Sequence, residues 1–356
     1  MPKYYPMIYG RRKAKSDLFR MQKQHPKGNP LRYPLGLHPM RADISFGKNT
    51  AVREGAIRLN SNHAIKLSAD KLATLEIWES ADIPHTSSEC DHFLPSNFIT
   101  ERGFDVERFR EAIDYPVVFK KIYSSGGKGM KFVRNIDELT AGLAEIGKGP
   151  LLKSYYIERL FNFHHEYRIH AAPSLKGVPL TYQFEYSKKD EDGNWEVHES
   201  DPIQREDGII LGVRKMIRQE AHDSGNTDRH FNVGSVFFTT KFPRPSEWEN
   251  MCSDAVKAIA ALKLDFGFVD CLYNSVTGQY AFCESGSNPG MNSSGNRPTI
   301  NVTAQHYRIA LRELLNQKHP PVEIKSNEIG ENRVESIKKL FFNQEDDGHN
   351  VEWINL

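Results

Sequence analysis

The sequence has few cysteines and none of the patterns in which they usually act together. Its 356 residues contain four, Cys90, Cys252, Cys271 and Cys283, and no C-x-x-C pair. In a chain this long, four isolated thiols are too few for a disulfide framework, and their spacing fits no zinc site. We therefore expect reduced, buried thiols and no cysteine nucleophile.

Long apolar runs are also absent. No stretch approaches the roughly 18 apolar residues that a membrane-spanning helix needs. The segment from Met1 to Pro6 has no apolar core of the kind found in a secretory signal. The sequence thus predicts a cytoplasmic protein without a membrane partner. An aromatic content of 11% argues against a disordered chain, and the length predicts two or three packed units.

Neither sign of charge is in excess overall, since 47 Lys and Arg stand against 46 Asp and Glu. This balance excludes a uniformly basic nucleic-acid coat. The distribution is uneven, however, because residues 1–66 contain fourteen Lys or Arg and only three acids. That segment could bind phosphates of a polymer, or it could neutralise acidic parts of the same chain, such as the tail after Glu323.

Apolar residues recur with the two-residue period of strands in some segments and the helical period in others. Strands are expected at 56–60, 116–122, 131–133, 151–157, 166–172, 182–187, 196–198, 231–240, 266–273 and 279–284. Helices are expected at 135–146, 248–262 and 300–315, and another should begin near Ser68, its expected N-cap. Hairpins mixed with helices indicate an α/β or α+β fold.

The most specific chemical signal is a glycine-rich segment between two strands. It consists of Ser124, Ser125, Gly126, Gly127, Lys128 and Gly129. Glycines let backbone N–H groups approach an anion closely, and Lys120 on the preceding strand could meet the same anion. The segment returns into a strand, so it is not a P-loop. Considered alone, it is explained equally well as an ordinary hairpin turn with solvated lysines.

A polar strand face is the second signal. Glu166, Arg168 and His170 share one face of a predicted strand, while Tyr167 and Ile169 point into a core. This alternation is typical of the wall of a polar site. No partner at ligand spacing completes a metal set for the histidines, so surface or hydrogen-bonded histidines are favoured.

Two carboxylates form the third signal. An antiparallel hairpin would place Asp270 and Glu284 close together on the same face. Such carboxylates repel each other unless a cation lies between them, and hard oxygen ligands suit Mg²⁺ bound together with phosphate oxygens. A pair of surface acids is the alternative, which the apolar neighbours, such as Phe268 and Phe282, disfavour.

In their order, these segments resemble the ATP-grasp superfamily of carboxylate–amine ligases, including the ribosomal-protein glutamate ligase and D-alanine ligase types. The resemblance covers residues 56–315. It rests on Asn60 to Ile65 with Ala69-Asp70-Lys71, on Pro116 to Lys120 with the glycine loop, on Glu166-Tyr167-Arg168, and on Asp270 and Glu284 with Asn288-Pro289-Gly290. It implies an ATP-grasp architecture in which two α+β subdomains grip ATP.

The resemblance also implies a division of the chain into four regions. A basic N-terminal pre-ATP-grasp region would span 1–66, and a linker helix with the N-lobe and its glycine-rich lid would span 67–160. The C-lobe with the metal site would span 161–320, and a polar acidic tail would span 321–356.

Roles for single residues follow from the same resemblance. Lys120 would contact the α and β phosphates, and the loop 124–129 would close over the β and γ phosphates. Lys153 would reach the α phosphate or the adenine, Tyr155, Tyr156 and Ile157 would pair with the adenine edge through their backbone, and Glu158 or Glu166 would hold the ribose. Arg168 would meet the γ phosphate or an acyl-phosphate, Asn232 would lie near the phosphates, and Asp270 and Glu284 would bind Mg²⁺, which Mn²⁺ could replace.

One position departs from the family pattern E-x-N-x-x-P-G, whose asparagine is a metal ligand. The matching residue here is Gly286, which has no side chain. Asn288 or Ser287 could supply the missing oxygen, or water could complete the coordination; alternatively the site is damaged. Intact Lys120 and Arg168, together with both carboxylates, favour an active enzyme.

The resemblance therefore implies an ATP- and Mg²⁺-dependent, ADP-forming ligase that joins a carboxylate to an amine through an acyl-phosphate. Its substrates would be an amino acid and an amine or carboxylate acceptor, which could be anionic. Arg214, Asn292 and Arg297 are candidate carboxylate binders, although solvated surface charge explains Arg214, on an expected loop or helix start, equally well. Two alternatives stay open: a nucleic-acid or anionic-polymer binding or modifying protein, and an ATP-grasp-type kinase. The oligomeric state is also open.

Overall fold

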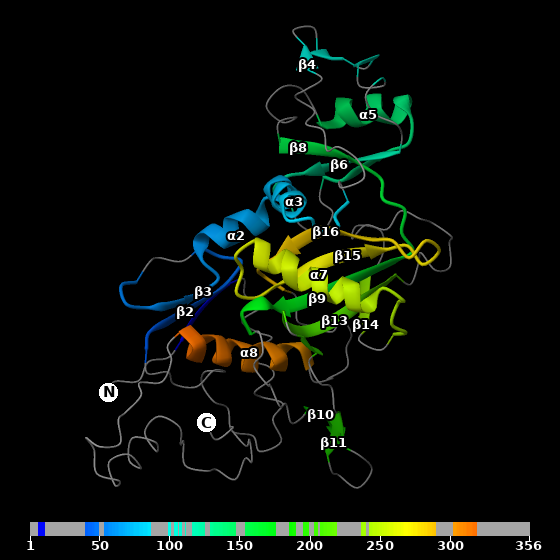
Figure 1. The fold of residues 1–356 in the computed structure, drawn as a ribbon. Coiled ribbons are helices and arrows are strands. Elements are labelled where there is room, and N and C mark those ends of the chain that lie inside the picture. Colours follow the sequence, from blue (N-terminus) through cyan, green and yellow to red (C-terminus); the bar gives the residue numbers. More distant parts are fainter. Residues whose placement is uncertain are drawn as a thin grey trace, which may run out of the picture.

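The computed structural model describes residues 6–10, 40–49, 53–86, 99–100, 103–105, 107–108, 111, 116–124, 129–146, 154–175, 185–189, 195–198, 203–205, 207–218, 236–239, 242–289 and 302–318. Within these ranges no helix has both the length and the apolar character needed to cross a membrane. Three sheets and the helices around them make up most of the fold (Figure 1).

The N-terminal sheet is parallel. Its strands are β1 (Met7–Gly10), β2 (Ala42–Phe46) and β3 (Ile57–Leu59), with β2 in the middle and buried throughout. The sequence predicted β3 but neither β1 nor β2. Two helices follow, α2 (Asn62–Ala69) and α3 (Lys71–Ser80).

The start of α3 corrects one prediction. Ser68 was expected to cap a helix, but it lies inside α2. Asp70 is the N-cap of α3 instead, since its Oδ1 accepts a hydrogen bond from the backbone N–H of Ala73 at 3.0 Å. Serine and aspartate can both cap a helix. Because α2 continues through Ser68 to Ala69, Asp70 is the residue between α2 and α3 and caps the second helix.

The region predicted as the N-lobe contains a three-stranded antiparallel sheet. β6 (Val117–Lys121) lies between β7 (Lys131–Val133) and β8 (Tyr155–Arg159), and α5 (Ile136–Ile146) follows β7. The two strands expected on either side of the glycine-rich segment are confirmed as β6 and β7. A short hairpin, β4 (Ile99–Thr100) and β5 (Gly103–Phe104), precedes this sheet in the chain.

The C-lobe contains a six-stranded sheet in the order β12-β13-β9-β15-β16, with β14 also paired to β13. Its strands are β9 (His165–Ala172), β12 (Ile203–Arg205), β13 (Gly208–Arg218), β14 (Val236–Thr239), β15 (Gly267–Tyr273) and β16 (Tyr280–Gly286). A 3₁₀ turn, η3 (Pro173–Leu175), follows β9. The predicted hairpin β10 (Glu185–Lys189) and β11 (Trp195–His198) forms a separate ribbon.

The strand β13 corrects a second prediction. Arg214 was expected on a loop or helix start, but it lies in this strand. The apolar run from Ile209 to Val213 has no clear alternation, because β13 is an interior strand between β12 or β14 and β9 and is covered on both faces. Periodicity alone therefore gave no strand signal here.

Two helices cover opposite faces of the C-lobe sheet (Figure 1). α7 (Trp248–Ala261) packs on the face that carries Tyr167 and Ile169, as predicted for these two residues. α8 (Val302–Lys318) packs on the other face, where the Tyr307 hydroxyl lies 3.2 Å from Nδ1 of His170. The polar face of β9 is thus partly covered by α8.

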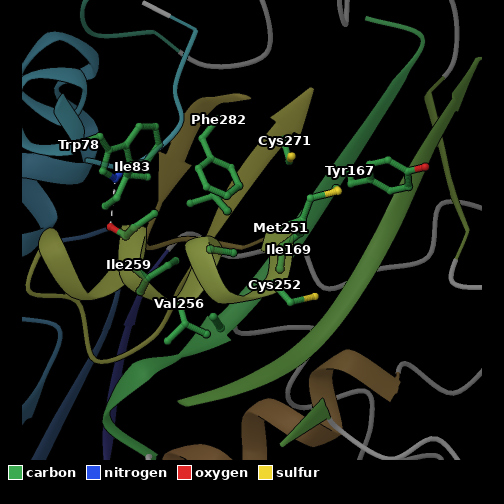
Figure 2. Close-up of a cluster of buried hydrophobic side chains, with 14 of the residues drawn as sticks. Trp78, Ile83, Tyr167, Ile169, Met251, Cys252, Val256, Ile259, Cys271 and Phe282 are labelled. Atoms are coloured by element: carbon green, nitrogen blue, oxygen red, sulfur yellow. Dashed lines mark hydrogen bonds between the residues drawn. The ribbon is translucent and has the colours of Figure 1, made fainter. Parts of the chain in front are cut away.

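The core beneath α7 reaches into the N-terminal helices (Figure 2). Trp78 of α3 is fully buried there and donates its indole N–H to the carbonyl of Ala258 at 3.1 Å. Cys252 and Cys271 belong to the same cluster as buried free thiols, as the sequence predicted. α3 is thereby fixed against the C-lobe.

Asn60 joins the N-terminal sheet to the C-lobe. It is fully buried and has a left-handed backbone with φ of +58°. Its side-chain amide donates to the carbonyls of Ser45 and Phe266 at 3.2 and 3.0 Å and accepts from the N–H of Asp265 at 2.9 Å. A residue singled out in the sequence as part of a motif therefore acts as a structural joint.

Candidate active site

Four ionisable side chains form a row across the C-lobe sheet. In the strand registers, Arg214 of β13 lies opposite Arg168 of β9, Arg168 opposite Asp270 of β15, and Asp270 opposite Glu284 of β16. Residues directly opposite one another point to the same face of a sheet, and this face is the one away from α7. The predicted proximity of Asp270 and Glu284 is confirmed.

Arg168 and Asp270 form a two-bonded ion pair at the centre of this row. Nε and Nη2 of Arg168 donate to the two carboxylate oxygens of Asp270 at 2.7 and 2.6 Å. The side chains are 19% and 5% exposed, respectively. Burial lowers the pKa of Arg168, but the charge and hydrogen bonds of Asp270 outweigh this effect and raise the pKa. The guanidinium stays cationic and is held in a fixed plane.

Glu284 lies at the end of the row among charges of both signs. Burial raises the pKa of Glu284, Lys71 opposes that rise, and the nearby negative charge of Asp270 adds to it. The ammonium nitrogen of Lys71 lies 3.6 Å from Oε1 of Glu284. Two carboxylates this close together are an arrangement that a further cation would stabilise.

Lys71 also reaches the beginning of the glycine-rich loop. Its Nζ donates to the carbonyl oxygen of Ser124 at 2.5 Å, and its backbone N–H donates to the carbonyl of Ile122 at 3.3 Å. The neighbouring Asp70 accepts a hydrogen bond from the hydroxyl of Tyr123. The α2–α3 junction therefore ties the first residues of the loop to the C-lobe. Sequence reasoning noted Lys71 only as part of a motif and did not propose it as a site residue.

On the N-lobe side, Lys120 and Glu158 form a buried ion pair between β6 and β8. The Glu158 side chain is 2% exposed and also accepts a hydrogen bond from the hydroxyl of Thr86 at 3.1 Å. Burial lowers the pKa of Lys120, but the charge and hydrogen bond of Glu158 together with other nearby negative groups outweigh this effect, so that the pKa is raised. Cys283 and Glu284 of the C-lobe contribute in the same direction, and Lys120 thus lies within electrostatic reach of the carboxylate row.

The remaining predicted nucleotide residues of the N-lobe lie close to this pair. Tyr155, Tyr156 and Ile157 are buried in β8, and Tyr156 is directly opposite Lys120. Burial, followed by the charge of Glu158, raises the pKa of Tyr156 well above its ordinary value. Gly129, at the end of the loop, has φ of +77°, a conformation that favours glycine.

Several predicted site residues lie outside the residues that the structure describes. They are Ser125, Gly126, Gly127, Lys128, Lys153, Asn232, Asn292 and Arg297. Their roles stay predictions. Glu166 is described; it precedes Arg168 by two positions, is partly exposed, and its charge helps to raise the pKa of Arg168.

The donor set for a divalent cation consists of Asp270 and Glu284. Among the described residues, no group of three or more His, Cys, Asp or Glu could hold a metal ion. Two carboxylates fit Mg²⁺, which commonly binds one or two of them and completes its shell with water and phosphate oxygens. The predicted third donor, Asn288, has its Oδ1 buried without a hydrogen-bond partner, and its Cβ lies near Gly47. The residues present therefore fit the cation.

Comparisons with known proteins bear on the fold. The family model for the ATP-binding domain of the carbamoyl-phosphate synthase L chain matches residues 92–169. The VanG D-Ala:D-Ser ligase from Enterococcus faecalis superposes with a TM-score of 0.50 at 16% sequence identity, covering 78% of this chain and 72% of the other. No curated protein sequence matches the chain.

Two further solved structures are similar at lower TM-scores. The D-alanine–D-alanine ligase from Bacillus anthracis has a TM-score of 0.45 and 14% identity over 72% of this chain and 69% of its own. The N5-carboxyaminoimidazole ribonucleotide synthetase from Thermotoga maritima has a TM-score of 0.47 and 12% identity over 87% of this chain and 76% of its own. The predicted ATP-grasp fold is confirmed by the family model and the VanG likeness.

Proposed function

We propose that this chain, which has the ATP-grasp fold, is an ATP- and Mg²⁺-dependent, ADP-forming ligase that joins a carboxylate to an amine. The observation that carries the proposal is the row of Arg214, Arg168, Asp270 and Glu284, whose Glu284 end lies within electrostatic reach of Lys120 on the N-lobe. Cations and carboxylates from two lobes at one place are what the transfer of a phosphoryl group requires.

In this proposal ATP lies between the lobes. Lys120 would contact the inner phosphates and Arg168 the γ phosphate, and both remain cationic because neighbouring carboxylates raise their pKa. Asp270 and Glu284 would hold the divalent cation, which when bound offsets negative charge on the phosphate oxygens. The protein then contributes mainly position and fixed charge.

The reaction would proceed in two displacements. An oxygen of the substrate carboxylate attacks the γ phosphorus, and the bond to the bridging oxygen breaks to release ADP. The nitrogen of the amine then attacks the carbonyl carbon of the acyl-phosphate, phosphate leaves, and the amine loses a proton. The loop 124–129 would exclude water, which otherwise hydrolyses the acyl-phosphate.

Arg214 is our candidate for binding the substrate carboxylate. It is 4% exposed and lies next to Arg168 in the row, so solvated surface charge does not explain it. Two arginines side by side attract an anion, and their planar donors suit a carboxylate. We further propose that this carboxylate belongs to an amino acid and that the acceptor supplies the amine.

A screen for ADP release tests the function. Amino acids paired with peptide, small-molecule or nucleic-acid acceptors would be incubated with Mg²⁺–ATP, and the products identified by mass. An amide product supports the ligase, whereas a phosphorylated product would favour the kinase alternative. Asp270→Asn should abolish pair-dependent ADP release, and Lys257→Met, on the exposed face of α7, serves as the control. ADP release that depended on no carboxylate–amine pair would contradict the proposal.

A further inference from the structure

Phe268 and Gly286 face each other in the strand pair next to the carboxylates. They are opposite one another in the register of β15 and β16, two positions along each strand from Asp270 and Glu284 and on the same face. A Cβ built on Gly286 would lie 2.5 Å from Cε1 and 2.6 Å from Cζ of the Phe268 ring. Real Cβ atoms do not come this close to an aromatic carbon. The ring therefore occupies the space that any side chain at position 286 would need.

The same ring lies against Arg168. The guanidinium carbon of Arg168 is 4.1 Å from the ring centroid of Phe268, well within the range of a cation–π contact. Arg168 is thus held on two sides, by the ring face and by the two oxygens of Asp270. Stacking on an aromatic plane combined with two parallel hydrogen bonds fixes both the position and the tilt of a guanidinium.

Packing alone is not enough to explain an aromatic residue here. Phe268 is 7% exposed and its ring lies 6.1 Å from that of His170. However, Phe268 lies on the charged face of β15. Its cross-strand neighbours are His170 on β9 and Gly286 on β16, and the ion pair of Arg168 and Asp270 is adjacent on the same face. A leucine would fill a similar volume but would offer Arg168 no π-face.

We propose that Phe268 is a positioning residue, whose ring has room only because residue 286 is glycine and which holds Arg168 in the plane that meets the γ phosphate. The inference rests on the proposed function, because Phe268 acts through Arg168. It adds a residue that the sequence motifs did not indicate, and it gives Gly286 a role: the missing side chain makes room for the ring that orients the cation.

The test compares two nucleotides that differ at the γ position. Dissociation constants for Mg²⁺–ADP and for the non-hydrolysable ATP analogue Mg²⁺–AMP-PNP would be measured by calorimetry on the full chain. In Phe268→Leu we expect the affinity for AMP-PNP to fall about 5-fold relative to the affinity for ADP. A change of this size corresponds to the loss of one partly desolvated cation–π contact. The ratio of the two constants is informative because a general loss of stability does not alter it.

Phe266→Leu is the matched control. Phe266 is fully buried near the same end of the sheet and packs on Phe46 and Tyr307. Its replacement should lower the thermal unfolding midpoint and leave the nucleotide ratio unchanged. An equal change of the ratio in both variants would overturn the inference.

A double-mutant cycle tests the role of Gly286. Gly286→Ala should shift the ratio in the same direction as Phe268→Leu, because its Cβ displaces the ring. In a Phe268→Ala background the same alanine has space, so it should add almost nothing, and the two effects should not be additive. Additive effects would contradict the assignment.

Failure of the proposed function would look different. Wild-type protein that bound neither Mg²⁺–AMP-PNP nor Mg²⁺–ADP would overturn both the function and the inference. Wild-type binding with an unaltered ratio in Phe268→Leu and Gly286→Ala would overturn the inference alone.

Discussion

The ammonium of Lys71 lies 3.6 Å from a carboxylate oxygen of Glu284 and 2.5 Å from the carbonyl oxygen of Ser124. One side chain therefore connects the entrance of the glycine-rich loop to the cation end of the site. Because hydrogen bonds of charged groups are strong and this one links two binding elements, we expect Lys71→Met to weaken Mg²⁺–AMP-PNP binding by about tenfold. Calorimetry provides the measurement.

The control for this variant is Lys257→Met, which removes an exposed ion pair with Asp254 on α7. Surface pairs contribute little, so nucleotide affinity should stay at the wild-type value. Equal affinity in Lys71→Met and wild type would show that the contact between loop and C-lobe has no part in binding.

The buried pair of Lys120 and Glu158 leads to a prediction about stability. Glu158→Gln leaves Lys120 without its counter-charge at a site where the carboxylate was 2% exposed. Breaking one side of such a pair costs about 3 kcal/mol of unfolding free energy, which denaturant titration measures. Adding Lys120→Met should restore at least about half of that loss, since no unpaired ion then remains.

Glu138→Gln is the matched control for Glu158→Gln. Glu138, in the first turn of α5, forms an exposed ion pair with Arg134, which precedes the helix, and the expected change is below about 0.5 kcal/mol. If Glu138→Gln and Glu158→Gln lost similar amounts of unfolding free energy, burial of the Lys120–Glu158 pair would not be the cause of the large loss.

Asn60 provides a test of the joint between the N-terminal sheet and the C-lobe. Asn60→Ala removes the hydrogen bonds to Ser45, Asp265 and Phe266 and keeps a Cβ in the left-handed conformation. We expect a loss of about 3 kcal/mol of unfolding free energy. Asn60→Gly should lose about 1 kcal/mol less, because glycine adopts positive φ without strain.

Thermal and denaturant unfolding of both Asn60 variants would check this order. Asn250→Ala, on the exposed side of α7, serves as the reference for an ordinary asparagine. If Asn60→Gly proved less stable than Asn60→Ala, strain at the positive φ of residue 60 would not account for the difference between the two variants.

His170 makes stability depend on pH. It is fully buried, and burial first, then the positive charges of Arg214 and Arg168, lower its pKa well below the usual 6.5. The hydroxyl of Tyr307 also faces the imidazole, at 3.2 Å from Nδ1. The unfolded chain takes up a proton at this histidine below about pH 6.5 and the folded chain does not.

The contribution of the neutral, buried His170 to the unfolding free energy is therefore fully present above about pH 6.5 and is lost as the pH falls below that value. His170→Gln cannot be protonated and should show a flatter decline of unfolding free energy between about pH 6.5 and 5. Denaturant titrations at several pH values would measure both slopes. Parallel slopes in the two proteins would contradict the assignment.

Much of the fold could be predicted from the sequence where the pattern was local. The two strands of the hairpin β15–β16 are consecutive in the chain, and the assumed register placed Asp270 opposite Glu284 correctly, although nothing in the sequence indicated the bulge between Asp270 and Cys271. The polar face of β9 followed from the same two-residue period. In each case the information lies within one strand or two consecutive strands.

The rest of the site depends on contacts between distant segments. Arg214 was misplaced because its strand is apolar on both faces, and Lys71 was overlooked because its partners lie on β16 and before the loop. Likewise, Phe268 looked like an ordinary core residue until the adjacent strand placed Arg168 on its ring. No local period encodes such pairings.

The charged row has a consequence for how the protein reaches its working state. Its members come from β9, β13, β15 and β16, and the pairings of β9 with β13 and with β15 join distant parts of the chain. Contacts of this kind form late and slowly, because long loops must close first. A slip of one residue in any of these strands would turn its ionic side chain toward α7. Catalytic competence should therefore be among the last properties to recover during refolding, later than helical signal or compaction.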